Sequence, residues 1–187
     1  MFVRTERLLL RPAWCEDAPA LSRAVGDEAV ARNSARIPWP YCLGDAEAHI
    51  ARQSGQPMPS LLVFRRTRGA PELIGGVGLA PDEEGHELGY WIARRHWGLG
   101  YATEAGRALV KMARDSLRLR RLHAGHFLDN PASGRVLRKL GFKPTGEIVS
   151  RHSVARGGVV PTALFALALD EEGSFACDDV AACRIAA

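Results

Sequence analysis

The chain has 187 residues, 47% of them hydrophobic, and a formal net charge of +4. This length supports one domain with a sizeable core, and no apolar run approaches the length of a membrane span. The positive charge, mostly arginine, favours anionic partners such as phosphates, but the basic residues are spread along the chain and aromatic residues make up only 7%, which disfavours a nucleic-acid-binding module.

The first half of the chain predicts one strand, helices, and then three strands. In chain order we expect a strand at 6–12, a helix at 16–32, a loop at 37–44, a helix at 45–53, and strands at 60–67, 72–80 and 85–93. Gly26 weakens the middle of the first helix, and Asp45 is a plausible N-cap for the second. Arginines flank the first strand and no small-residue cleavage site follows it, so we expect a cytoplasmic protein without a signal peptide.

The second half predicts alternating helices and strands. We expect a helix at 101–117, a strand at 121–128, a helix at 130–142, and strands at 146–155 and 160–169. Asn130 can cap the second of these helices, Pro131 suits its first turn, and Gly141 can end it in a left-handed conformation. The residues 1–169 form the predicted domain, and the tail 170–187 carries no usable pattern.

The order of these elements indicates the fold class. Three strands in succession suggest an antiparallel meander, whereas a later strand, helix and strand suggest parallel pairing. A mixed α/β sheet in a single domain follows.

The stretch RRHWGLGYATEAGRAL, residues 94–109, places two glycines between a cationic pair and a predicted helix. The first N–H groups of a helix have no partner within the helix, and the helix dipole makes that end partly positive. Without side chains at Gly98 and Gly100, phosphate oxygens can reach those N–H groups, and Arg94 and Arg95 add positive charge. The loop therefore suits a pyrophosphate.

Three phosphate-binding loops compete with a plain tight turn at this place. A Walker loop is excluded, because Gly100 is followed by tyrosine and alanine instead of lysine and serine or threonine. A dinucleotide-binding loop needs a glycine where Thr103 stands and an acidic residue after the next strand, which is absent. The third pattern, Arg/Gln-x-x-Gly-x-Gly/Ala, matches residues 95–100. The six residues alone leave the tight turn open.

Other motifs accompany this loop in order: TERLLLRP at 5–12, ELGYWI at 87–92, WGLGYATEA at 97–105 and NPASGRVLRKLGF at 130–142. With them the sequence resembles the GNAT acetyltransferase superfamily over residues 5–169, and most closely its Rim-like branch of ribosomal-protein N-terminal acetyltransferases. The resemblance implies acetyl-CoA as cosubstrate, with its pyrophosphate on the glycine loop. It also implies a mixed, mostly antiparallel sheet that is splayed in the middle and has helices on both faces.

Residues of the strand before the loop and of the helix after the next strand complete the expected cofactor site. The strand 86–92 leaves Glu87 about one pantetheine arm from an anion bound after Ile92, and an open strand edge can hydrogen-bond that arm. The residues expected to contact the cofactor are Tyr90, Trp91, Ile92, Arg95, Trp97, Gly98, Leu99, Gly100, Tyr101, Ala102, Asn130 and Ser133.

The resemblance also implies roles in acetyl transfer to an amine. Glu87 is the candidate general base, because the family often places a glutamate on this strand, and the alternative is an ordinary salt-bridged residue. Ser133, in the family's Asn-x-x-Ser, is the candidate for assisting thiolate departure, and the alternative is support of the helix cap. Many relatives use a tyrosine there, but no tyrosine follows Tyr101. Trp39, with Tyr41 and Glu87, is expected to border the acceptor.

Three functions stay open from the sequence. The chain is expected to acetylate a primary amine by direct transfer in a ternary complex, the amine being a protein N-terminus or a small molecule such as an antibiotic, amino acid or polyamine. It is alternatively a module that binds acetyl-CoA without turnover. A homodimer is compatible with the family. No metal site is expected, because the four cysteines form no C-x-x-C pair and His123 and His126 fall on opposite strand faces.

Overall fold

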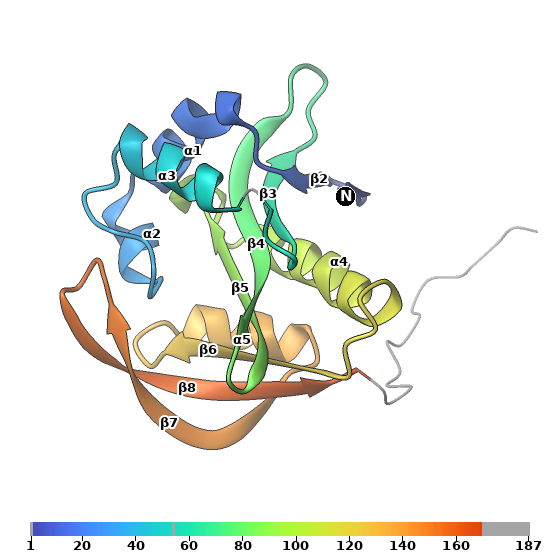
Figure 1. Ribbon diagram of the computed structural model, residues 1–187, viewed down its shortest axis with the longest axis vertical. Helices are drawn as coiled ribbons and strands as arrows, with labels where there is room; N and C mark the ends of the chain where they lie inside the picture. Colours follow the sequence, from blue (N-terminus) through green and yellow to red (C-terminus); the bar gives the residue numbers. More distant parts are fainter. Residues whose placement is uncertain (1, 54, 170–187) are drawn as a thin grey trace, which may run out of the picture.

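The computed structural model describes residues 2–53 and 55–169, and the predicted tail 170–187 lies outside these residues. The strands are β1 (Val3–Arg4), β2 (Leu8–Pro12), β3 (Ser60–Arg65), β4 (Glu72–Asp82), β5 (Gly85–Ile92), β6 (Arg121–Phe127), β7 (Lys143–Ser153) and β8 (Gly158–Ala168). The α-helices are α1 (Ala18–Val25), α2 (Glu28–Arg32), α3 (Leu43–Gln53), α4 (Tyr101–Asp115) and α5 (Pro131–Lys139), and two 3₁₀ turns are η1 (Cys15–Asp17) and η2 (Arg94–His96). Figure 1 shows their arrangement.

The strands form one sheet in the order β1-β2-β3-β4-β5-β6-β8-β7. Neighbours pair antiparallel except β5 and β6, which run parallel and share a single register pair, Glu87 with His123. Beyond that pair β5 and β6 diverge, so the sheet opens between them toward Ile92. The predicted mixed, mostly antiparallel sheet, splayed in the middle, is confirmed.

Helices cover both faces of the sheet, as predicted. The alternation of apolar residues along β3 shows why: Leu61 and Val63 join the core beneath α4 and α5, whereas Leu62 and Phe64 join the core beneath α1 and α3. In Figure 1 the α1 and α3 layer gathers at the upper left, and β7 and β8 sweep below it. This division leaves the α1 and α3 face partly uncovered over β5, where the larger cavity described below lies.

The helix predicted at 16–32 is two helices with a break between them. Gly26 ends α1 with φ −67° and ψ 38°, and the carboxylate of Asp27 then accepts a hydrogen bond from the Ala29 N–H to start α2. The glycine that weakened the helical pattern is therefore its end.

The helix predicted at 45–53 begins earlier, and Asp45 is not its N-cap. The helix α3 starts at Leu43, and the Asp45 carboxylate, within the first turn, accepts from the Cys42 N–H at 2.8 Å. This is the reaching-back half of a capping box. By contrast, Asn130 caps α5 as predicted, accepting from the Ser133 N–H at 3.3 Å, and Gly141 has φ +89°.

Several strands differ from the predicted bounds, among them β2, which begins at Leu8 instead of 6, and β8, which begins at Gly158 instead of 160. The short β1 was not expected, and β7 begins at Lys143 instead of 146 because its pairing with β8 resumes across a register shift between Pro144 and Ile148. Within the residues that the structure describes, no helix is long and apolar enough to cross a membrane.

Candidate active site

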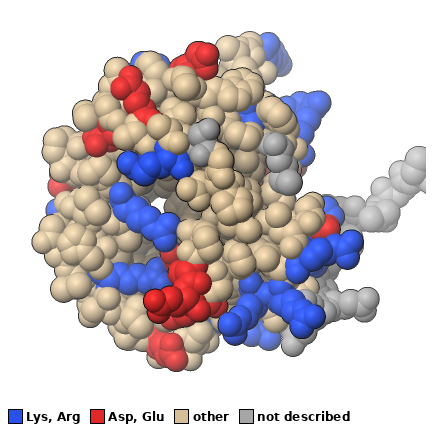
Figure 2. Space-filling model, in the orientation of Figure 1, with Lys and Arg blue, Asp and Glu red and all other residues tan. Residues whose placement is uncertain are grey.

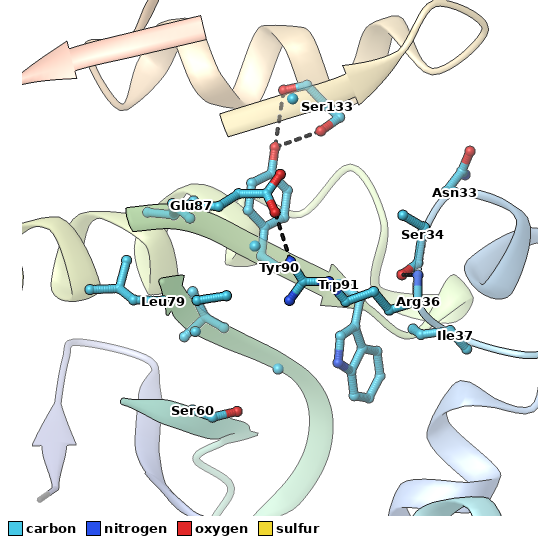
Figure 3. Close-up of a pocket in the computed structure, with 18 of the residues that line it drawn as sticks. Asn33, Ser34, Arg36, Ile37, Ser60, Leu79, Glu87, Tyr90, Trp91 and Ser133 are labelled. Carbon is cyan, nitrogen blue, oxygen red and sulfur yellow. Dashed lines mark hydrogen bonds and ion pairs between the residues drawn. The ribbon is translucent and has the colours of Figure 1, made fainter. Parts of the chain in front are cut away.

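Two cavities meet on β5. The larger, about 700 Å³, lies between the segment after α2, the helix α3 and strands of both sheet halves, and its lining includes Arg36, His49 and Glu87. The smaller, about 370 Å³, lies between β5, the glycine loop and α5. Residues that line both are Asn33, Ser34, Tyr90, Trp91 and Ser133. Figure 3 shows this junction, with Tyr90 reaching from β5 toward Ser133.

The glycine loop presents free backbone amides to the smaller cavity. Gly98 and Gly100 have φ of +78° and +82°, and Gly100 caps α4 without any side-chain bond. The first amide of the helix to bond back is that of Glu104, to the Gly100 carbonyl at 3.0 Å. In the described part of the chain, the amides of residues 98–103 have no acceptor. A Cβ built on Gly98 meets nothing within 4 Å, so this position faces open space.

The segment between β1 and β2 braces this loop from outside. The Arg7 guanidinium donates to the Leu99 carbonyl at 3.0 Å and to the Glu104 carboxylate at 2.7 Å, and it lies 4.6 Å from the centre of the Tyr101 ring. The Thr5 hydroxyl donates to Glu104 at 2.6 Å. Burial would raise the pKa of Glu104, but the bonds from Thr5 and Arg7 outweigh it and lower the pKa. A charged carboxylate thus ties the loop to the first strands.

The cations beside the smaller cavity are not the ones that the motif suggested. Arg95 donates to the Glu72 carboxylate at 2.8 Å, and it does not line this cavity. Burial would raise the pKa of Glu72, but hydrogen bonds from Arg65, Arg95 and His96 lower it to about 2, so this cluster is a firm ion-pair network. The lining cations are instead Arg135 and Lys139 of α5.

Most of the predicted cofactor-contacting residues line the smaller cavity. They are Tyr90, Trp91, Ile92, Trp97, Gly98, Gly100, Tyr101, Ala102, Asn130 and Ser133. Leu99, like Arg95, is absent from the lining, and it is 52% exposed. The sequence reasoning missed Arg135 and Lys139, although their spacing of four along a helix whose start was recognised puts them on one face.

Tyr90 and Ser133 form a hydroxyl pair at the junction of the cavities. The Tyr90 hydroxyl lies 2.7 Å from the Ser133 Oγ and donates to the Ser133 carbonyl at 3.1 Å. Burial raises the pKa of Tyr90 to about 12, although the bond with Ser133 opposes the shift. The sequence analysis predicted only a cofactor contact for Tyr90, because the nearness of its hydroxyl to Ser133 depends on the splay of the sheet.

Glu87 lies between two arginines on the wall of the larger cavity. Its carboxylate accepts from Arg36, of the segment after α2, at 2.9 Å, and from Arg151 of β7. Figure 3 shows the Arg36 bond crossing in front of Tyr90. Side chains alternate between the two faces along β5, since Leu88 and Ile92 join one core and Trp91 the other. Glu87 as general base stays a prediction.

The predicted acceptor residues of the loop 37–44 do not reach the larger cavity. Trp39 is 39% exposed, and Tyr41 packs against the α1 and α3 core, where burial, followed by the charge of Asp45, raises its pKa to about 12. Neither residue lines the larger or the smaller cavity. Ile37, the first residue of this loop, lines the larger cavity instead, and so does Arg36, which precedes the loop.

Three histidines line the larger cavity, His49, His126 and His152, and the sequence assigned none of them to the acceptor site. His49 of α3 lies 2.6 Å from the Gln53 amide nitrogen, and burial, with Arg52 adding to it, lowers the pKa of His49. His126 of β6 bonds the Phe127 carbonyl through Nδ1 at 2.8 Å. Within residues 2–53 and 55–169, no three metal-ligating side chains are grouped, and Cys15 and Cys42 are exposed free thiols.

The chain is similar to known acetyltransferases. Residues 7–143 match the model of the acetyltransferase (GNAT) domain. The uncharacterized N-acetyltransferase YoaA of Bacillus subtilis is 31% identical over 156 residues, which cover 77% of this chain and 84% of that protein.

Solved structures share the fold. A GNAT-family acetyltransferase from Bacillus anthracis superposes with a TM-score of 0.78 at 22% identity, over 91% of this chain and 100% of that one. RimL, a ribosomal L7/L12 alpha-N-protein acetyltransferase solved with coenzyme A, gives 0.76 at 20% identity, over 91% and 99%.

Proposed function

The chain belongs to the GNAT acetyltransferase family, and from this premise we propose that it transfers the acetyl group of acetyl-CoA to a primary amine, with the N-terminus of a peptide as the preferred acceptor. The observation that carries this proposal is the meeting of two cavities at Tyr90 and Ser133. One cavity has the features of an anion-binding cofactor site, and the other is wide enough for a peptide end.

The smaller cavity fits acetyl-CoA. The unpaired amides of residues 98–103 and the start of α4 offer several donors and a partial positive charge to a pyrophosphate. Gly98 leaves the space above them open, and Arg135 and Lys139 supply charge for further phosphate oxygens. Ile92 and Trp91, at the diverging end of β5, are placed to line the pantetheine arm where the sheet opens.

The side chains at the junction are suited to proton movement. Acetyl-CoA, when bound, supplies an acetyl group activated as a thioester. The Tyr90 hydroxyl keeps its proton at neutral pH, because its pKa is about 12. Ser133 Oγ, 2.7 Å away, can pass a proton to the leaving thiolate and regain one from Tyr90 Oη, and Tyr90 then regains its proton from solvent. Glu87, on the acceptor side, is the proposed base that takes the proton of the amine, directly or through water.

A peptide N-terminus is the favoured acceptor on chemical and geometric grounds. An α-amino group has a pKa of about 7.7–8.0, against about 10.4 for a lysine side chain. Glu87, which is paired with two arginines, can therefore deprotonate an α-amine more easily than a lysine side chain. The larger cavity also reaches from α3 to β7, which gives an extended chain room to lie across β5. A small amine is the second candidate, because the same cavity can enclose one.

The test is release of CoA thiol from acetyl-CoA with the full chain and a panel of peptides and small amines. We expect turnover of N-terminal α-amines, and a large loss of turnover in Glu87→Gln and Ser133→Ala with unchanged CoA affinity. Turnover of small amines alone would move the acceptor to the second candidate. Tight CoA binding without release on any acceptor would show a binding module and overturn the proposal.

A further inference from the structure

Glu87 pairs with two arginines, so this cluster holds two positive charges and one negative charge. Arg36 and Arg151 come from segments more than a hundred residues apart, and both bond the one carboxylate, each to a different oxygen. The Glu87 side chain is only 15% exposed, while those of Arg36 and Arg151 are 68% and 26% exposed. Two guanidinium groups thus converge on one carboxylate at the wall of the larger cavity, and the cluster carries an excess positive charge.

Both guanidinium groups have donors to spare. A guanidinium has five N–H donors in a fork that matches a carboxylate, and each of these two gives one nitrogen to Glu87. Across the described residues, their other side-chain nitrogens contact no acceptor. A second carboxylate would find two arginines already held in place by the first.

Among the residues that the structure describes, one further acidic side chain, Asp82, lines the cavity, but it bonds a histidine and neither of the two arginines. Asp82 lies 2.9 Å from the His123 ring nitrogen. Burial would raise the pKa of Asp82, but the hydrogen bond with His123 outweighs burial and lowers this pKa. His49 has a lowered pKa and is neutral at neutral pH. Figure 2 shows a hollow near the centre of this face with blue side chains along its margin.

We propose that the acceptor carries a carboxylate close to its amine, and that Arg36 and Arg151 bind this carboxylate while Glu87 faces the amine. The proposal rests on the proposed function, whose acceptor it narrows. The two positive guanidinium groups complement the carboxylate of such an acceptor, and the negative charge of Glu87 between them complements its cationic amine. The arriving carboxylate would share the two arginines with Glu87 and loosen their hold on it. A polyamine or other purely cationic acceptor would face two repelling arginines.

Two kinds of molecule carry this chemistry: a peptide with an acidic residue next to its N-terminal residue, and a free amino acid. Matched probes separate them. The first pair is the peptide amide Ser-Glu-Ala-Ala against Ser-Gln-Ala-Ala, and the second is serine against serinamide. We expect about tenfold or higher kcat/KM for the acid of at least one pair, as for a hydrogen-bonded charge pair. The pair that shows the preference identifies the source.

Variants test whether the arginines cause the preference. Arg36→Gln and Arg151→Gln should bring the acid-to-amide ratio close to one, mainly through KM. Arg68→Gln, an exposed arginine outside both cavities, should keep the ratio. Thermal melts of all three variants check that the chains are folded.

Binding of the same four probes to the CoA-loaded protein, measured by calorimetry, separates two kinds of failure. Preferential binding of the acids without thiol release on any amine would remove the proposed function and keep this inference. Equal binding and equal turnover of acid and amide, or a preference that survives both arginine variants, would overturn the inference and leave the acetyltransferase intact.

Discussion

Replacing Gly98 by alanine separates the cofactor role of the loop from its contribution to stability. Gly98 has φ +78°, a conformation that costs an alanine about 1–2 kcal/mol, and its new methyl group would project into the open space beside the loop that the pyrophosphate is proposed to occupy. A hydrogen bond to a charged group contributes about 1.5–3 kcal/mol, so the loss of one corresponds to about 10- to 150-fold in Kd. We expect Gly98→Ala to weaken CoA binding by this amount.

Gly146 offers a matched control. It has φ +88°, a Cβ built on it also meets nothing within 4 Å, and it lies on β7 away from both cavities. Both alanine variants should lower Tm by about 2–8 °C, because 1 kcal/mol shifts the Tm of a chain of this size by about 2–4 °C. Calorimetric titration with CoA should show a changed Kd for Gly98→Ala alone. Equal affinities in the two variants would refute the placement of the pyrophosphate on this loop.

Other changes probe the junction, the brace and the acceptor wall. Tyr90→Phe should lower kcat about 100-fold or more without changing the Kd of CoA, and the double variant with Ser133→Ala should fall no further if the two hydroxyls form one relay, so additive losses in thiol release would contradict the relay. Arg7→Gln should raise the Kd of CoA about tenfold through loss of its bonds to Leu99 and the helix α4, while the acceptor KM stays the same, as titration and kinetics can show. The lowered pKa of His49 means that the unfolded chain takes up its proton first as the pH falls, so the stability from this group is complete above about pH 6.5 and is lost below it. The urea midpoint of the wild type should therefore fall more between pH 7.5 and 5.5 than that of His49→Gln, and parallel curves would contradict this.

Local signals in the sequence predicted the parts of the fold that local physics determines. The helix α5 has its cap, its first-turn proline and its terminal glycine within one short stretch, and all three act as expected. The glycine loop before α4 could be recognised because a loop whose amides bind an anion needs residues without side chains, and Gly98 and Gly100 stand close together. Asp45 was misplaced because capping and first-turn roles differ by only two or three residues, and both favour an acidic residue.

The contacts that join distant segments could not be predicted in the same way. Arg7 reaches the glycine loop across more than ninety residues, and Tyr90 meets Ser133 only because β5 and β6 diverge. No spacing in the sequence encodes either contact. Arg95 shows the opposite case, where a motif residue of the right charge is drawn to Glu72 because that carboxylate emerges from the adjacent strand.

The single register pair between β5 and β6 gives these separate observations a common origin. If the two strands stayed paired beyond Glu87, the gap between them would close, and the cofactor cavity could not reach the face on which the acceptor cavity lies. Glu87 stands at the point where pairing stops, and the pleat of β5 turns its carboxylate to the acceptor side, where it bonds Arg36 and Arg151. Tyr90 stands three residues further along, where the opening exposes its hydroxyl to Ser133. The position of the divergence therefore decides whether the two cavities can meet, because pairing of β5 with β6 extended to Tyr90 would close the opening through which its hydroxyl reaches Ser133.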